Sequence, residues 1–120
     1  MNLVQKTENH EFDTLIADTS FPINVAIQPI AGGQGMLMRG SVLGMATDKA
    51  VLVGGGTETV AEFILADDVD TGDAAEGTVN AQVYVSGAFN RFKLILGGTD
   101  KVETHEKDLK EVGIYLKAVL

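Results

Sequence analysis

The stretch "ADDVDTGD", residues 66 to 73, places four aspartates and an Asp-Thr-Gly triplet in eight positions. Such a stretch is compatible with the active-site loop of an aspartic protease, a calcium loop or a solvent-exposed turn. An EF-hand calcium loop needs oxygen ligands at positions 1, 3 and 5, followed by glycine at position 6. Counted from Asp68, the third ligand position falls on Gly72, so the spacing excludes an EF-hand loop.

The triplet Asp70-Thr71-Gly72 matches that of the retroviral-type aspartic proteases, and "ILGG" at 95 to 98 resembles a later segment of those small dimeric enzymes. Their two catalytic aspartates lie in a buried turn, where they share one proton. Here three further aspartates flank the triplet, and their repulsion and solvation favour an exposed loop. We therefore predict a solvated turn between two strands, with a dimeric protease that uses Asp70 as the alternative.

The glycine-rich segments do not match a phosphate-binding loop. In "AGGQGMLMRG" (31 to 40), Met38 stands where the dinucleotide fingerprint requires glycine. A P-loop would continue after Gly40 with lysine and then serine or threonine, but Ser41 and Val42 follow instead. We interpret this segment, and "GGGTET" at 54 to 59, as turns.

The two histidines do not form a metal motif. His105-Glu106 would begin the zincin pattern, but the position of its second histidine is occupied by Leu109. His10 lies far away in the N-terminal segment, and the chain has no cysteine. The sequence therefore predicts no metal site, no cofactor and no catalytic residue set.

The charge balance is acidic: nine basic and seventeen acidic residues give a net charge of −8. The resulting field repels phosphate backbones and anionic lipids, so we expect no nucleic-acid and no membrane partner. No apolar run approaches the roughly 18 to 20 residues of a membrane helix, and charges interrupt the first 20 residues where a signal peptide would be apolar. We expect one soluble domain without disulfides and without a small-molecule substrate.

The apolar pattern divides the chain into a flexible N-terminal arm, residues 1 to 20, and a single β-rich domain, residues 21 to 120. The arm shows no sustained period of 2 or 3.6. "FPINVAIQPI" (21 to 30) alternates, and its two prolines are typical of an edge strand. Further strands are predicted at 36–38, 41–46, 50–53, 59–66, 78–87, 91–96 and 114–120.

In the 78–87 strand, the valines and Ala81 are predicted to face one side, while Asn80, Gln82, Tyr84 and Ser86 face the other. One helix follows the 91–96 strand. Asp100 is predicted to cap it, with Glu103 completing a capping box, and Gly113 to end it. The fold class is thus mainly β with one C-terminal helix.

Four segments resemble, in order and spacing, the bacteriophage lambda head decoration protein D family. They are "RGSVLG" (39 to 44), "ILADDVDT" (64 to 71), "VYVSGAFNR" (83 to 91) and "GIYL" (113 to 116). The similarity extends from Pro29 to Leu120. It implies a small β-clip domain that forms a homotrimer on the outer surface of the expanded phage head, made in the host cytoplasm, where it stabilises the capsid lattice.

The resemblance also implies that the N-terminal arm becomes ordered when it docks on the major capsid protein. A segment with few apolar residues cannot fold alone, but it can add a strand to a partner's sheet. The arm of this chain lacks the proline and threonine richness of the lambda member, so contacts are not transferred residue by residue. Candidate capsid-binding residues are Phe12, Leu15, Ile16, Phe21, Pro22 and Ile23. A trimeric module of another virion part is a second alternative.

Overall fold

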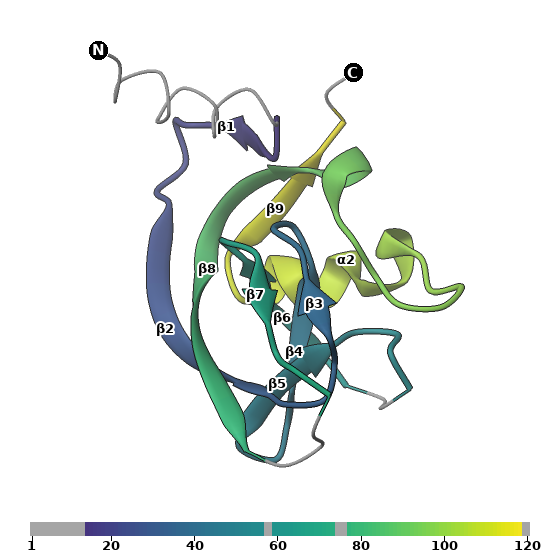
Figure 1. Ribbon diagram of the computed structural model, residues 1–120. Coiled ribbons are helices and arrows are strands. Elements are labelled where there is room, and N and C mark those ends of the chain that lie inside the picture. Colours follow the sequence, from purple (N-terminus) through teal and green to yellow (C-terminus); the bar gives the residue numbers. More distant parts are fainter. Residues whose placement is uncertain (1–13, 57–58, 74–76, 119–120) are drawn as a thin grey trace.

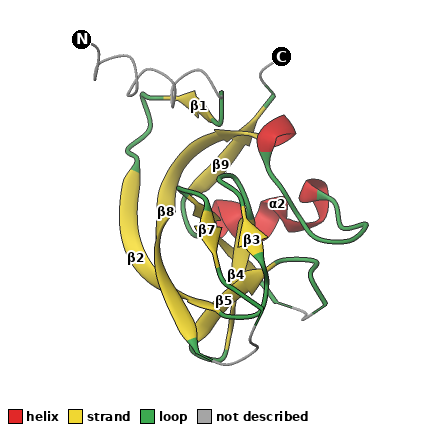
Figure 2. Cartoon of the chain, viewed as in Figure 1, coloured by secondary structure: helices red, strands yellow, loops and turns green. Residues whose placement is uncertain are grey.

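The computed structural model describes residues 14–56, 59–73 and 77–118 (Figures 1 and 2). Within these residues the fold is mainly β, with a small barrel-like sheet and one α-helix, so the predicted fold class is confirmed. The elements are β1 (Ile16–Asp18), β2 (Asn24–Ala31), β3 (Met36–Leu37), β4 (Val42–Ala46), β5 (Lys49–Leu52), β6 (Ala61–Leu65), β7 (Val69–Asp70), β8 (Thr78–Asn90), η1 (Arg91–Lys93), α2 (Val102–Glu111) and β9 (Ile114–Lys117).

The long strand β8 organises the sheet (Figure 1). The strand order is β1-β8-β2-β5-β4-β6, and β6 returns to pair with β8, which closes the barrel-like arrangement. Strand β9 also pairs with β8, in parallel, while β3 and β7 form a separate two-stranded sheet. Strands that lie far apart in the sequence therefore pair with the same strand, β8.

Alternate residues of the inner strands supply two hydrophobic clusters, one on each face. Ile64 and Tyr84 belong to the first cluster, which α2 and β9 cover with Leu109, Ile114 and Leu116. Leu65 and Val83, their immediate neighbours in the sequence, belong to the second cluster, together with Ile30, Leu37, Leu43 and Ala50. This division follows from the period of 2 of a β-strand.

Strand β2 is an edge strand over most of its length, as its prolines predict. It pairs with β8 from Asn24 to Ala31, but on its other side the described residues supply only one β-bridge, between Ile30 and Ala50 in β5, together with a contact of Gln28 Nε2 with Met45 Sδ at 3.3 Å. Val25 is 48% exposed and Ile27 60% exposed. Although Val25 and Ile27 alternate with polar residues, the side of β2 that carries them does not face the core at these two positions.

The prediction of a strand at 91–96 is wrong, because a 3₁₀ turn begins at Arg91. Asn90 accepts a hydrogen bond from the backbone N–H of Phe92 through its side-chain oxygen (3.1 Å), which caps the 3₁₀ turn η1. Only Ile95 returns to β structure, as an isolated bridge with Ser41. The chain leaves the sheet here because the cap turns the backbone immediately after β8.

The helix is confirmed, but its predicted capping box is not formed. Lys101 occupies the N-cap position and makes no side-chain cap hydrogen bond. The carboxylate of Asp100 instead accepts from the backbone N–H of Lys101 (3.0 Å) and bonds to His105 (2.8 Å). Gly113 has a φ of +93° and donates to Lys110 O, which ends the helix as predicted.

Tyr84 lies on the side of β8 opposite Val83 and Val85, as alternation predicts, but this side is buried as well. Its ring packs against Phe89 with a centroid distance of 5.0 Å, and it is 7% exposed. Its hydroxyl oxygen accepts a hydrogen bond from Arg39 Nη1 (2.7 Å). From Val83 onward every residue of β8 is buried or partly buried, so a polar group on a side chain no longer indicates exposure to solvent. No helix in the described residues is long and apolar enough to cross a membrane.

Candidate binding surface

The predicted arm enters the core earlier than the sequence indicates. Leu15 is 2% exposed and belongs to the first hydrophobic cluster. Strand β1 pairs antiparallel with the end of β8, with Ile16 opposite Phe89. Leu15 lies in the core and β1 belongs to the sheet, so contacts with the domain begin before the predicted boundary after residue 20. Phe12 lies outside the described residues.

An aromatic and ionic cluster holds the segment after β1 against β9. The ring of Phe21 lies 5.5 Å from that of Tyr115, centroid to centroid, and Lys117 Nζ lies 4.9 Å above the Phe21 ring. The same ammonium group contacts Asp18 Oδ2 at 3.1 Å. Strand β1 and the end of β9 thus lie at one end of the molecule, on either side of β8 (Figure 1).

The remaining predicted arm residues also contact the domain itself. Ile23 is partly buried and packs on the first cluster, while Pro22 is exposed and its carbonyl accepts from Ser86 Oγ (3.1 Å). Of the five described candidates, Leu15, Ile16, Phe21 and Ile23 therefore have intramolecular packing partners. These contacts hold residues 15 to 23 on the domain.

Asp18 contacts both Ser20, which follows β1, and Lys117 at the end of β9. Hydrogen bonds from the Ser20 hydroxyl, the Ser20 backbone N–H and Lys117 together lower its pKa from 3.8 to about 2. Because its carboxylate is stabilised only in the folded state, Asp18 contributes stability above pH 3.8, and this contribution is lost as the pH falls toward 2.

We predict that an NMR titration will give the Asp18 carboxyl a midpoint near 2. Ser20→Ala should move this midpoint toward 3.8, because it removes the hydroxyl donor but keeps Lys117. Asp18→Asn should make the free energy of unfolding less dependent on pH between 4 and 2. An ordinary midpoint near 3.8 in the unmodified protein would contradict these contacts.

The "ADDVDTGD" segment is an acidic, exposed loop that contains the short strand β7. Asp67, Asp68, Asp70 and Asp73 are exposed, as predicted. Asp70 accepts from the backbone N–H of Gly72 (2.9 Å) in a local turn. An aspartic protease requires a buried, shared carboxyl pair at this position, and an exposed carboxylate in a local turn does not favour that alternative.

Thr71 is the buried residue of this loop, a role that the sequence does not indicate. It is 5% exposed. Its hydroxyl donates to Gly35 O (2.7 Å) and accepts from the backbone N–H of Gln34 (2.8 Å). Thr71 therefore joins this loop to the glycine-rich turn after β2, and its role is structural.

The four motifs that carry the family resemblance are neighbours in the fold. Between the first two, Gly40 N–H donates to Leu65 O and Leu65 N–H donates to Ser41 O, each at 2.9 Å. Ile64 in the second motif is paired with Tyr84 in the third, and Gly87 N–H donates to Gly113 O (3.1 Å) in the fourth. The motifs thus form one continuous structural unit around β8.

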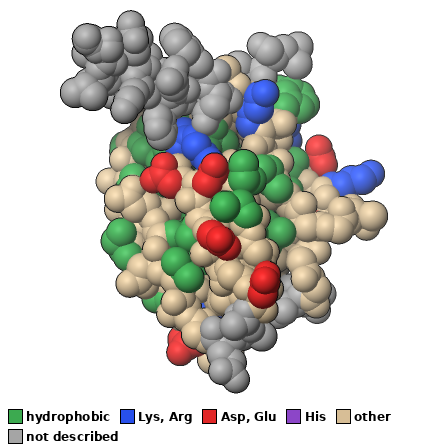
Figure 3. All heavy atoms as spheres, viewed as in Figure 1, with side chains coloured by type: hydrophobic (Ala, Val, Ile, Leu, Met, Phe, Trp, Pro, Cys, Tyr) green, Lys and Arg blue, Asp and Glu red, His purple; other side chains and the backbone are tan. Residues whose placement is uncertain are grey.

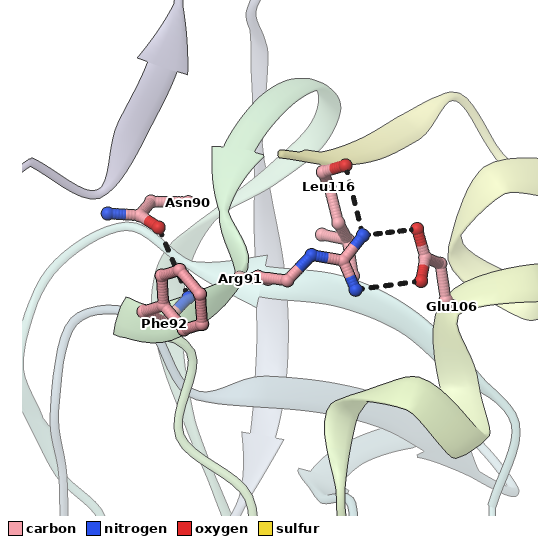
Figure 4. A network of polar contacts seen from close by, with 5 residues as sticks. All are labelled: Asn90, Arg91, Phe92, Glu106 and Leu116. Atoms are coloured by element: carbon pink, nitrogen blue, oxygen red, sulfur yellow. Dashed lines mark hydrogen bonds and ion pairs between the residues drawn. The ribbon is translucent and has the colours of Figure 1, made fainter. Parts of the chain in front are cut away.

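Arg91, the last residue of the third motif, joins η1 to the helix and the final strand (Figure 4). Its guanidinium group forms a bidentate ion pair with Glu106, with distances of 3.0 and 2.8 Å. It also donates to Leu116 O at 3.4 Å. The hydrogen bonds to Glu106 raise the pKa of Arg91. This side chain therefore fixes the packing of α2 and β9 against the end of β8.

A cavity of about 340 Å³ lies between the turn after β5 and the start of α2. Its polar groups include Asp100, His105 and Thr104. The hydrogen bond with His105 lowers the pKa of Asp100. In the described residues no group of three or more histidine, cysteine or acidic side chains is placed to hold a metal ion. The hydrogen bond between Asp100 and His105 holds the 97–101 turn against α2.

Exposed apolar side chains are the surface feature that sequence reasoning missed. The most exposed are Val60, Ile27, Met36, Phe92, Val25 and Met38. On the face seen in Figure 3, hydrophobic side chains lie between scattered acidic ones. Single exposed apolar residues are ordinary, but a pair on an open sheet edge is not. Val25 and Ile27 form such a pair.

Comparison with protein-family models found no match, and comparison with curated proteins found none either. The resemblance therefore rests on the four motifs and their contacts within the fold.

Proposed function

We propose that the chain is a structural virion protein of a tailed phage. It forms a homotrimer, binds the outer surface of the expanded head at three-fold positions and stabilises the capsid lattice. Its partner is the major capsid protein, on which the N-terminal arm becomes ordered. The observation that carries this proposal is that the four motifs of the resemblance contact one another around β8.

The anchored start of the arm supports the same function. Residues 15 to 23 are held by the core and by the cluster of Phe21, Tyr115 and Lys117, so a binding segment before them starts from a defined place. Three such segments on one trimer would make the second and third contacts intramolecular. Their joint affinity then exceeds that of one arm by about 10² to 10⁴.

The experiment compares the full chain with a chain that starts at Thr14, mixed with expanded heads that lack decoration protein. We expect the full chain to saturate the heads, and the shortened chain to bind at least about 100-fold more weakly, because the avidity of three arms is lost. Equal binding would contradict the arm mechanism, and no binding of the full chain would contradict the proposed function. Residues 14 to 20 are kept so that the core is not disturbed.

The two alternatives predict different results. A map of the protein on the particle separates a head protein from a module of the tail or a fibre, because only the former lies at the three-fold positions of the head. Incubation with an unstructured polypeptide at acidic pH, beside Asp70→Asn, tests the protease. Cleavage that disappears with this substitution would establish the protease instead.

A further inference from the structure

The open edge of β2 presents hydrogen-bonding groups that the described fold leaves unused. Antiparallel pairing with β8 is regular from Val25 to Ala31, with Pro29 opposite Asn80. Proline has no N–H to donate, so Pro29 fits this ladder only at a position whose backbone groups face away from β8. Residues two and four positions earlier share that orientation. The N–H and C=O groups of Ile27 and Val25 therefore point to the open edge.

The ribbon formed by β2 and β8 carries no charge. No acidic, basic or histidine residue occurs from Thr19 to Met38, or from Thr78 to Asn90. Natural edge strands are commonly protected from further pairing by lysine, by inward charges or by bulges. Apart from Pro29 and the irregular register between Asn24 and Val25, this edge has no such protection. It is also apolar, since Val25 and Ile27 are about half exposed.

The sequence of this edge is complementary to itself. If two copies pair antiparallel about Ala26, Val25 of one chain lies opposite Ile27 of the other, and Asn24 lies opposite Gln28. Apolar side chains then meet apolar ones on one face, and amide side chains meet on the other. The outward groups of Val25 and Ile27 form the hydrogen-bonded pairs, so the two Ala26 residues form a close, non-hydrogen-bonded pair.

We propose that the β2 edge binds the β2 edge of a second copy, and that this two-fold contact continues the β2–β8 ribbon across both molecules. The occupant is a second copy because the edge is complementary to itself. Two chains that each carry a net charge of −8 repel one another, and the uncharged ribbon is a surface on which they can meet without facing like charges. The contact is two-fold, so it is separate from the three-fold contacts of the proposed trimer and does not depend on the proposed function. It would join two chains or two trimers.

The absence of cysteine from the sequence allows a test of the register. In the proposed pairing the two Ala26 Cα atoms lie about 4.5 Å apart, within the range of a disulfide. The two Asn24 Cα atoms lie about 14 Å apart, although Asn24 is on the same face and exposed. We expect Ala26→Cys to form a covalent dimer under mild oxidation at least about ten-fold faster than Asn24→Cys, since a disulfide requires Cα atoms within about 7 Å.

Solution mass gives a second, independent measurement. At increasing concentration, the unmodified chain should reach twice the mass of Ile27→Lys, whose charge opposes pairing of the edge. Val60→Lys is the matched control, because Val60 is 62% exposed but lies outside the ribbon, and it should retain the doubled mass. Equal oxidation rates of the two cysteine variants, or equal masses of the unmodified chain and Ile27→Lys, would overturn the proposal. The head-binding result does not enter this test.

Discussion

Replacing Leu15 with alanine should lower the free energy of unfolding by about 2 to 5 kcal/mol, as expected for a buried leucine in a well-packed core. Leu15 is 2% exposed and belongs to the cluster that contains Val42 and Phe89. The substitution removes apolar contacts and leaves a cavity in this cluster. Urea unfolding of the full-length protein measures this difference directly.

Two comparisons make the result specific. Val25→Ala removes a side chain of similar size that is 48% exposed, and should change stability by less than about 1 kcal/mol. A chain that starts at Thr14 should unfold like the full chain, whereas a chain that starts at Phe21 should lose at least as much stability as Leu15→Ala. If Leu15→Ala had no measurable effect, the arm would extend to residue 20, as the sequence alone predicts.

The reason why the sequence misplaces this boundary is the length of β1. A strand of three residues is too short to show a period of 2, and its partner Phe89 lies more than seventy positions later in the chain. Pairing over such a separation leaves no local pattern. By contrast, β2, β8 and the helix are long enough for their periods, prolines and terminal glycine to predict them.

The alternating side-chain directions of β8 were predictable, but the burial of both faces after Gln82 was not. Up to that point exposed and partly buried residues alternate, whereas from Val83 to Asn90 every residue is buried or partly buried, with the two hydrophobic clusters on its faces. Alternation indicates faces only while one of them is solvated. The buried positions of Tyr84 and Asn90 depend on contacts with Arg39 and with the turn η1, which no spacing in the sequence reveals.

The "ADDVDTGD" loop also shows that composition predicts exposure but does not predict contacts between distant loops. Composition correctly predicts that the aspartates of "ADDVDTGD" are exposed, because carboxylates are solvated unless paired. It does not predict that Thr71 is buried, since its partners Gln34 and Gly35 lie in another loop. One signal of the β2 edge was present in the sequence, namely the absence of charge from Thr19 to Met38 in a strongly acidic chain.

The glycines of "GGGTET" were predicted as turn residues, but one of them has a second role. Gly54 has a φ of +87°, and a Cβ atom there would lie 2.5 Å from Gly97 O and 2.8 Å from Asp100 Cβ. Gly97 N–H donates to Val53 O at 2.8 Å, so the two turns are in direct backbone contact. A side chain at Gly54 would have to separate them.

Gly54→Ala should therefore destabilise the protein by about 2 to 5 kcal/mol, the sum of about 1 to 2 for a left-handed backbone and about 1 to 3 for overpacking. Gly56→Ala is the matched control in the same turn. Its φ is +114°, but no described atom lies within 4 Å of the added Cβ, so only the backbone term of about 1 to 2 kcal/mol applies. Chemical unfolding of both variants measures the difference.

A larger effect at Gly54 than at Gly56 would locate the close approach of the two turns, and equal effects would contradict it. The loss should be accompanied by a change at the helix, because the turn that Gly54 contacts contains Asp100, which bonds to His105 in α2 at 2.8 Å. Pushing this turn away would lengthen that bond and loosen the first turn of the helix. Amide hydrogen exchange in residues 102 to 106 should therefore become faster in Gly54→Ala than in Gly56→Ala.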